Sequence, residues 1–159
     1  MRPSCTLATR RDLLLTTGGF ILLATSGGLA HARPSINVWK DPNCGCCTGW
    51  VEHLRRNGFA ATIIETSDMR PIKARRGVPP ELASCHTAEI QGYTIEGHVP
   101  ARAIARLLAE KPEAHGLAVP GMPIGSPGME GGSPEPYDVI LFGKGPPARF
   151  ERYVAERPI

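Results

Sequence analysis

Residues 36–51 read INVWKDPNCGCCTGWV, and the order of patterns within this stretch decides the fold. Residues 36–40 alternate apolar with polar side chains and are rich in strand-forming types, which predicts a first β-strand. The turn residues 41–43 end that strand. From Cys46 onward, apolar side chains recur at helical spacing until Asn57-Gly58, a typical helix exit. The chain is therefore expected to run from a strand, through a cysteine-rich turn, into the start of a helix.

The segments that follow predict a second strand, a short helix, a hairpin and a third helix. Their expected bounds are residues 59–65, 68–76 with Asp68 as the cap, 87–91 and 93–96 around Gly92, and 100–110. The resulting order is βαβαββα. This order is typical of an α/β fold of the thioredoxin-like or glutaredoxin-like kind, with helices on both faces of a small mixed sheet.

Beyond Lys111 the sequence departs from that layout. Residues 116–136 are crowded with Gly and Pro and also contain two methionines, and only residues 137–142 predict another strand. We therefore expect a Gly/Pro/Met-rich C-terminal extension, added to the thioredoxin-like core.

The first 32 residues have the features of an export signal. Arg10 and Arg11 precede an apolar run that reaches Leu29, and residues 30–32 form a small-x-small cleavage site. We expect cleavage after Ala32 and a periplasmic location. The paired arginines favour the twin-arginine route, with the Sec route as the alternative. The run is shorter than the ~20 residues that span a bilayer, so a membrane anchor is the weaker interpretation.

Cleavage would leave residues 33–159 as a single domain of 127 residues with 15 basic and 14 acidic side chains. Nucleic acids and anionic membranes are bound by clustered positive charge, which a net charge of about +1 does not supply. Both partners are therefore excluded, and stable membrane insertion after cleavage is not expected.

Four cysteines carry the chemistry of this domain. Cys44, Cys46 and Cys47 fall within four residues at a helix start, where free N–H groups and the helix dipole favour thiolates. Cys85 is expected at the start of the third strand, opposite this cluster. Two disulfides are the alternative for an even count in an exported protein, and Cys44 with Cys47 could also form a redox pair.

The neighbouring ligand types favour copper(I) as the metal. Met122 and Met129 each lie in a Pro-Gly context, and thioether with thiolate selects copper(I) over harder ions; two gap-filling methionines are the alternative. A zinc site would use well-spaced cysteine pairs, which are absent. His86 is expected to be a ligand or to support one. His98 could lie near the site, whereas His53 and His115 are expected on the surface.

Several segments together resemble the CopG-type periplasmic copper-resistance family, formerly a domain of unknown function. They are residues 40–47, 77–87, 95–100, 116–123 and 125–130. The resemblance implies a thioredoxin-like fold with a thiolate-bridged, multinuclear copper cluster, and it leaves redox change of the copper open. The residues that match the family's metal site are Cys44, Cys46, Cys47, Cys85, His86, Met122 and Met129.

Two functions from different classes follow. The first is a periplasmic copper(I)-binding protein that sequesters or oxidises copper, with copper ions and other copper-handling proteins as partners. The adjacency of Cys46 and Cys47 favours thiolates that bridge several ions. The second is a thiol-disulfide oxidoreductase that uses Cys44 and Cys47. A disulfide-stapled binding module ranks third.

Overall fold

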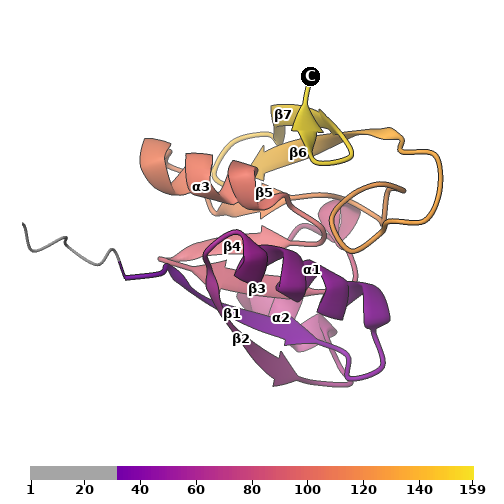
Figure 1. Ribbon diagram of the computed structural model, residues 1–159. Helices are drawn as coiled ribbons and strands as arrows, with labels where there is room; N and C mark the ends of the chain where they lie inside the picture. Colours follow the sequence, from indigo (N-terminus) through magenta and orange to yellow (C-terminus); the bar gives the residue numbers. More distant parts are fainter. Residues whose placement is uncertain (1–31) are drawn as a thin grey trace, which may run out of the picture. The chain divides into compact units, whose positions relative to one another are not determined.

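The computed structural model describes residues 32–159 (Figure 1). Nearly all of the expected export signal therefore lies outside the described residues. The bounds of the elements, in chain order, are β1 (Ser35–Lys40), α1 (Gly45–Arg56), β2 (Ala60–Glu65), α2 (Arg70–Arg75), the 3-10 turn η1 (Pro80–Leu82), β3 (Thr87–Ile90), β4 (Tyr93–Glu96), α3 (Ala101–Glu110), β5 (Gly116–Ala118), β6 (Pro136–Phe142), β7 (Ala148–Val154) and β8 (Arg157–Pro158).

One eight-stranded mixed sheet organises the described chain, in the order β2-β1-β3-β4-β5-β6-β7-β8. The β1–β2 and β4–β5 pairs are parallel and the other pairs are antiparallel. The predicted α/β class is therefore confirmed. The sheet is larger than the small sheet expected, because strands from the C-terminal segment continue it.

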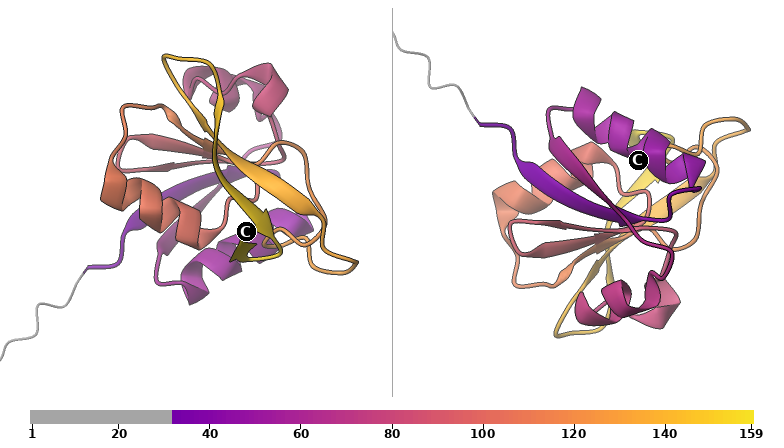
Figure 2. Two further views of the ribbon diagram at one scale, coloured as in Figure 1. Left: turned by 90° about the horizontal axis from the view of Figure 1, so that it is seen from above. Right: turned by 90° about the horizontal axis from the view of Figure 1, so that it is seen from below.

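Helices cover both faces of the sheet. Helices α1 and α3 lie on one face and α2 lies on the other (Figure 2). The main core fills the α1/α3 face, where Ile36 and Val38 of β1 meet Trp50 of α1 and Ile104 and Leu107 of α3, all fully buried. Burial of such large apolar side chains is the main force that holds the helices on the sheet.

The predicted βαβαββα order is confirmed, with small shifts at the boundaries. Helix α2 begins at Arg70, two residues later than expected, although Asp68 still accepts a hydrogen bond from the Arg70 N–H at 3.1 Å. The hairpin turn between β3 and β4 is made by Gln91 and Gly92, both with positive φ. Two such residues in sequence form the tight turn that suits the twist of a two-stranded ribbon.

The expectation of one strand beyond Lys111 is wrong. Strand β5 lies at the start of the Gly/Pro-rich segment and pairs in parallel with β4, and β7 and β8 follow β6. Strand β7 was missed because charged residues fill its sequence, ARFERYV, although Tyr153 within it is fully buried. The C-terminal segment is thus half of the sheet, with a long loop inserted between β5 and β6.

None of the helices in residues 32–159 is long and apolar enough to cross a membrane. The finding covers the described helices alone.

Candidate metal centre

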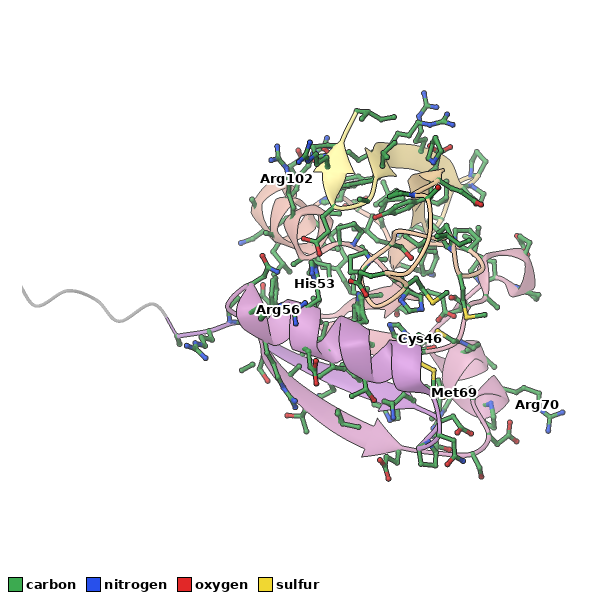
Figure 3. All side chains as sticks on the ribbon, turned by 45° about the vertical axis from the view of Figure 1, so that its right-hand side comes forward. Cys46, His53, Arg56, Met69, Arg70 and Arg102 are labelled. Atoms are coloured by element: carbon green, nitrogen blue, oxygen red, sulfur yellow. A yellow bond between two sulfur atoms is a disulfide. The ribbon has the colours of Figure 1, made fainter. Side chains whose placement is uncertain are left out.

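Three of the four candidate cysteines lie at the first turn of α1. Cys44 occupies the N-cap position, Cys46 lies in the first turn (Figure 3), and Cys47 is fully buried. Cys44 and Cys47 form a disulfide, and the Cys46 Sγ lies 3.3 Å from the Cys44 Sγ. The N–H groups of a first helical turn have no partner within the helix, so this end of α1 favours negative charge on sulfur.

Cys85 approaches this cluster from another part of the fold. It stands just before β3, the strand that pairs with β1, and so at the edge of the sheet where α1 begins. The sulfur atoms of Cys44, Cys46, Cys47 and Cys85 all lie within 4.8 Å of one another. Cys46 and Cys85 are free thiols, so residues 32–159 hold one disulfide rather than the two of the stapled alternative.

Two histidines complete the surroundings of Cys85. Its Sγ lies 3.2 Å from His86 Nδ1 and 3.1 Å from His98 Nε2. His98 donates its Nδ1–H to the Pro127 carbonyl at 2.7 Å, so Nε2 of the neutral ring carries a lone pair aimed at Cys85. A second backbone or carboxylate partner of this kind is typical of histidines that bind metals.

His86 is the most enclosed member of the group. It is fully buried between the Trp50 ring, 4.3 Å away between centroids, and the His98 ring at 5.1 Å. Its Nε2 has no hydrogen-bond partner among residues 32–159, although a buried polar atom of this kind usually has one. The other ring nitrogen, Nδ1, is the one that faces Cys85.

Burial controls the protonation of these groups. Desolvation and the neighbouring Cys46 raise the pKa of Cys85 to about 12. Desolvation lowers the pKa of His86 well below its ordinary range, and it also lowers the pKa of His98. In the metal-free protein the thiol is therefore protonated and both imidazoles are neutral at pH 7, so a metal ion must displace the thiol proton.

The loop between β5 and β6 lies against the centre at three points. The Gly121 carbonyl accepts a hydrogen bond from the Ser84 hydroxyl, beside Cys85, and the Pro127 carbonyl accepts the one from His98. At Gly128, which has φ +87°, an added Cβ would lie only 2.5 Å from the Cys46 carbonyl oxygen. This loop therefore closes over the first turn of α1.

The two candidate methionines belong to this loop but differ in exposure. Met122 follows the Gly121 anchor and is 51% exposed, whereas Met129 follows Gly128 and is half-buried. The backbone contacts bring both residues to the margin of the centre. Met129 is thus better shielded from solvent than Met122.

Of the residues that the sequence singled out, the structure brings the four cysteines and His86 together. It adds His98, which the sequence placed near the site only as one option; the signal for it was the hairpin that returns the chain to Cys85. The expectation for His53 is wrong, because this side chain is buried and points from α1 toward α3 (Figure 3). His115 is exposed, as expected.

The donor set suits a soft metal ion. Cysteine sulfur and neutral imidazole nitrogen converge on Cys85 from two sides. Soft sulfur ligands select copper(I), and imidazole also suits copper. His86 Nδ1, 3.2 Å from the Cys85 Sγ, is a further nitrogen donor inside the centre.

Comparison with known proteins also links this chain to copper. A family described as "Protein of unknown function, DUF411" matches residues 82–129. Two solved structures, titled copper resistance protein CopG in forms 2 and 1, are 45% and 44% identical to the chain, each with a TM-score of 0.72. The alignments cover 76% and 77% of this chain and 98% of each of those chains. No curated protein sequence matches the chain.

The matched region of residues 82–129 contains Cys85, His86, His98 and the part of the β5–β6 loop that contacts the centre. The solved relatives extend the likeness across nearly their whole length. The chain belongs to the CopG family of copper-resistance proteins.

Proposed function

We propose that this protein binds copper(I) through Cys44, Cys46, Cys47 and Cys85 and acts in copper resistance by sequestering the ion. The convergence of four sulfur atoms within 4.8 Å of one another carries the proposal. His86 and His98 add nitrogen donors at Cys85, and Met129 and Met122 are the outer ligands.

The arrangement supports a site for several ions. Cys46 and Cys47 are adjacent in sequence, and Cys85 belongs both to the four-cysteine group and to a group with the two histidines. A thiolate can bridge two copper(I) ions, so a shared Cys85 would join the two groups into one cluster.

Copper loading requires the reduced protein. The Cys44–Cys47 disulfide must take up two electrons and two protons from a dithiol reductant, which is oxidised to its own disulfide, before it yields two thiols. These thiols release their protons to solvent when copper(I) binds. We expect the reduced protein to bind more copper(I) than the form with this disulfide.

Anaerobic titration of the reduced protein with copper(I), against a chromophoric chelator, tests the proposal. Cys46→Ser and Cys85→Ser should each lower the copper stoichiometry. His115→Ala, at an exposed position away from the centre, is the control. Unchanged stoichiometry in both cysteine variants would exclude a shared cysteine site.

The proposal also includes a thioredoxin-like fold and a periplasmic location. The β1-α1-β2 unit, the β3–β4 hairpin and α3 support a thioredoxin-like core, with cysteines at the helix that follows β1. We further propose that residues 1–32 direct export to the periplasm. N-terminal sequencing of the periplasmic protein should then begin at Arg33.

A thiol-disulfide oxidoreductase is the second candidate, and the Cys44–Cys47 disulfide at the start of α1 favours it. In this function the pair would exchange two electrons with a substrate disulfide. An insulin-reduction assay on the metal-free protein decides: turnover that survives Cys46→Ser and Cys85→Ser supports the oxidoreductase, and its absence supports copper binding alone.

A further inference from the structure

A buried carboxylate lies behind Cys85, on the far side from the α1 cysteines. Glu96, the last residue of β4, is fully buried. Its Oε1 accepts hydrogen bonds from the Ser84 N–H at 2.6 Å and from Lys73 Nζ at 2.5 Å, and its Oε2 accepts one from the Thr87 hydroxyl at 2.7 Å. Every group that contacts the two oxygens can donate, which is the environment of an ionised carboxylate.

The hydrogen bonds to Glu96 fix the chain on both sides of Cys85. Ser84 precedes the cysteine by one residue and Thr87 follows it by two, so the carboxylate spans the segment that presents the thiol. The Gly97 N–H also donates to the His86 carbonyl at 3.0 Å. The end of β4 therefore holds residues 84–87 at three points, two on the backbone and one on the Thr87 hydroxyl.

Lys73 connects this network to the opposite face of the sheet. It lies on α2, donates to the Thr87 hydroxyl at 3.1 Å as well as to Glu96, and is 16% exposed. Burying an ionised carboxylate without a partner is costly, and Lys73 offsets that cost. Lys73, on one face of the sheet, thus stabilises the charge of Glu96, and Glu96 in turn contacts the residues on either side of Cys85.

The close approach of the two segments leaves little room for another arrangement. At Gly97, with φ +70°, an added Cβ would lie 2.6 Å from the Ser84 Cβ and from the Val119 carbonyl oxygen. The backbone of residues 96–98 lies directly against Ser84, and this close approach requires a glycine at position 97. The same segment places His98 beside Cys85.

We propose that Glu96, held by Lys73, is a positioning residue that sets the place of the Cys85 sulfur in the metal centre. This inference rests on the proposed copper function. It goes beyond the ligand set, because Glu96 acts on the metal only through Cys85. Supporting contacts of this kind typically change metal affinity by about 10- to 100-fold.

The experiment compares copper(I) affinities of Glu96→Gln and wild type, by anaerobic competition with a chromophoric chelator, after circular dichroism has established folding. We expect affinity to fall by about 10- to 100-fold. Glu89→Gln is the matched control, since it breaks another ion pair between the sheet and the end of α2, with Arg76, and touches no residue beside Cys85. It should leave the affinity unchanged.

A double-mutant cycle separates positioning from a general structural role. In the Cys85→Ser background, Glu96→Gln should change copper affinity by no more than about twofold, because the residue through which it acts is gone. An equal loss in both backgrounds, or wild-type affinity in folded Glu96→Gln, overturns the inference.

A second variant keeps the test of Glu96 decisive. If Glu96→Gln does not fold, Thr87→Val removes a single donor to the carboxylate. A lower affinity that disappears in the Cys85→Ser background supports the inference, and unchanged affinity overturns it. Failure of the proposed function looks different, because the wild-type protein itself would then bind no copper through its cysteines.

Discussion

The two ring nitrogens of His98 have different partners, and this division leaves Nε2 with a lone pair on the side of Cys85. Nδ1 is committed to the Pro127 carbonyl, so Nε2 faces Cys85 as an acceptor. We expect His98→Ala to weaken copper(I) binding by about 10- to 100-fold. Chelator competition measures the change, with His115→Ala as the control, and wild-type affinity in His98→Ala would exclude a role for this ring.

Gly128 is the residue at which the loop meets α1. An Ala side chain there would meet both the Cys46 carbonyl and the Trp50 N–H, besides the unfavourable positive φ. Gly121 has a similar φ of +69° but open space around it. Gly121→Ala should therefore cost about 1–2 kcal/mol, and Gly128→Ala about 1–3 kcal/mol more.

Urea unfolding of the two glycine variants measures this difference. Copper binding provides a second measurement, because only Gly128→Ala should push the loop away from the centre. Equal losses of stability in the two variants would mean that the close approach at Gly128 is not maintained in solution.

At this scale, local spacing determined what could be predicted. Three cysteines within four residues predict a metal or redox site by themselves. His98 lies 13 residues from Cys85, and the β3–β4 hairpin brings the two residues together. His53 was misjudged because its neighbours Glu52 and Arg55 are charged, although its own position on α1 faces α3. A single side chain's direction depends on which helix packs beside it.

The first turn of α3 is capped by a side chain from α1, that of His53. The Ala101 N–H, one of the free donors of the first turn, donates to His53 Nε2 at 3.0 Å, and His53 Nδ1 faces Glu156 at 3.1 Å. This pairing needs a neutral ring with its proton on Nδ1. Protonation of Nε2 would remove the acceptor that Ala101 uses.

The stability of the protein should consequently depend on His53 at mildly acidic pH. Burial lowers the pKa of His53, with Arg56 acting in the same direction and Glu156 and Glu130 opposing it. Below about pH 6.5 the unfolded chain takes up a proton that the native ring resists, so stability is complete above that pH and falls as the pH decreases.

Unfolding free energies measured from pH 7.5 to pH 5 test this dependence. His53→Gln, whose amide oxygen can still accept from Ala101, should flatten the profile relative to wild type. His86 and His98 contribute in the same direction in both proteins, so the difference isolates His53. His115→Gln is the control, and an identical slope in His53→Gln would contradict the assignment.

Elements were predictable where their pattern is local. The seven elements of the βαβαββα order, β1 to α3 without the 3-10 turn η1, follow from apolar periodicity and from turn residues such as Gly92. Strands β5 and β7 were missed for different reasons. Strand β5 has three residues, too few for a pattern, whereas β7 contains several charged residues and buries Tyr153 alone, against Tyr137 of β6.

The whole sheet forms one structure in which the C-terminal strands are integral. Tyr153 of β7 is fully buried, and its ring stacks on Tyr137 with centroids 5.8 Å apart. Tyr153→Ala should cost about 3–5 kcal/mol, as for other large aromatic residues removed from a core. Phe150→Ala, at a partly covered position on the same strand, should cost less.

Two probes establish whether the sheet unfolds as a unit. Tryptophan fluorescence, from Trp39 on β1 and Trp50 on α1, reports on the first half of the fold, and far-ultraviolet circular dichroism reports on the whole sheet. In Tyr153→Ala both signals should change in a single coincident transition. Separate transitions would mean that β6 to β8 unfold independently of the remainder.

The Pro127 carbonyl that orients His98 comes late in the chain, 42 residues after Cys85 and beyond every strand of the first half. During synthesis, all four thiols are present long before the group that fixes the imidazole beside them. A partly synthesised chain therefore contains the four cysteines before His98 can be oriented beside them. The centre takes its final arrangement only when the loop between β5 and β6 has folded.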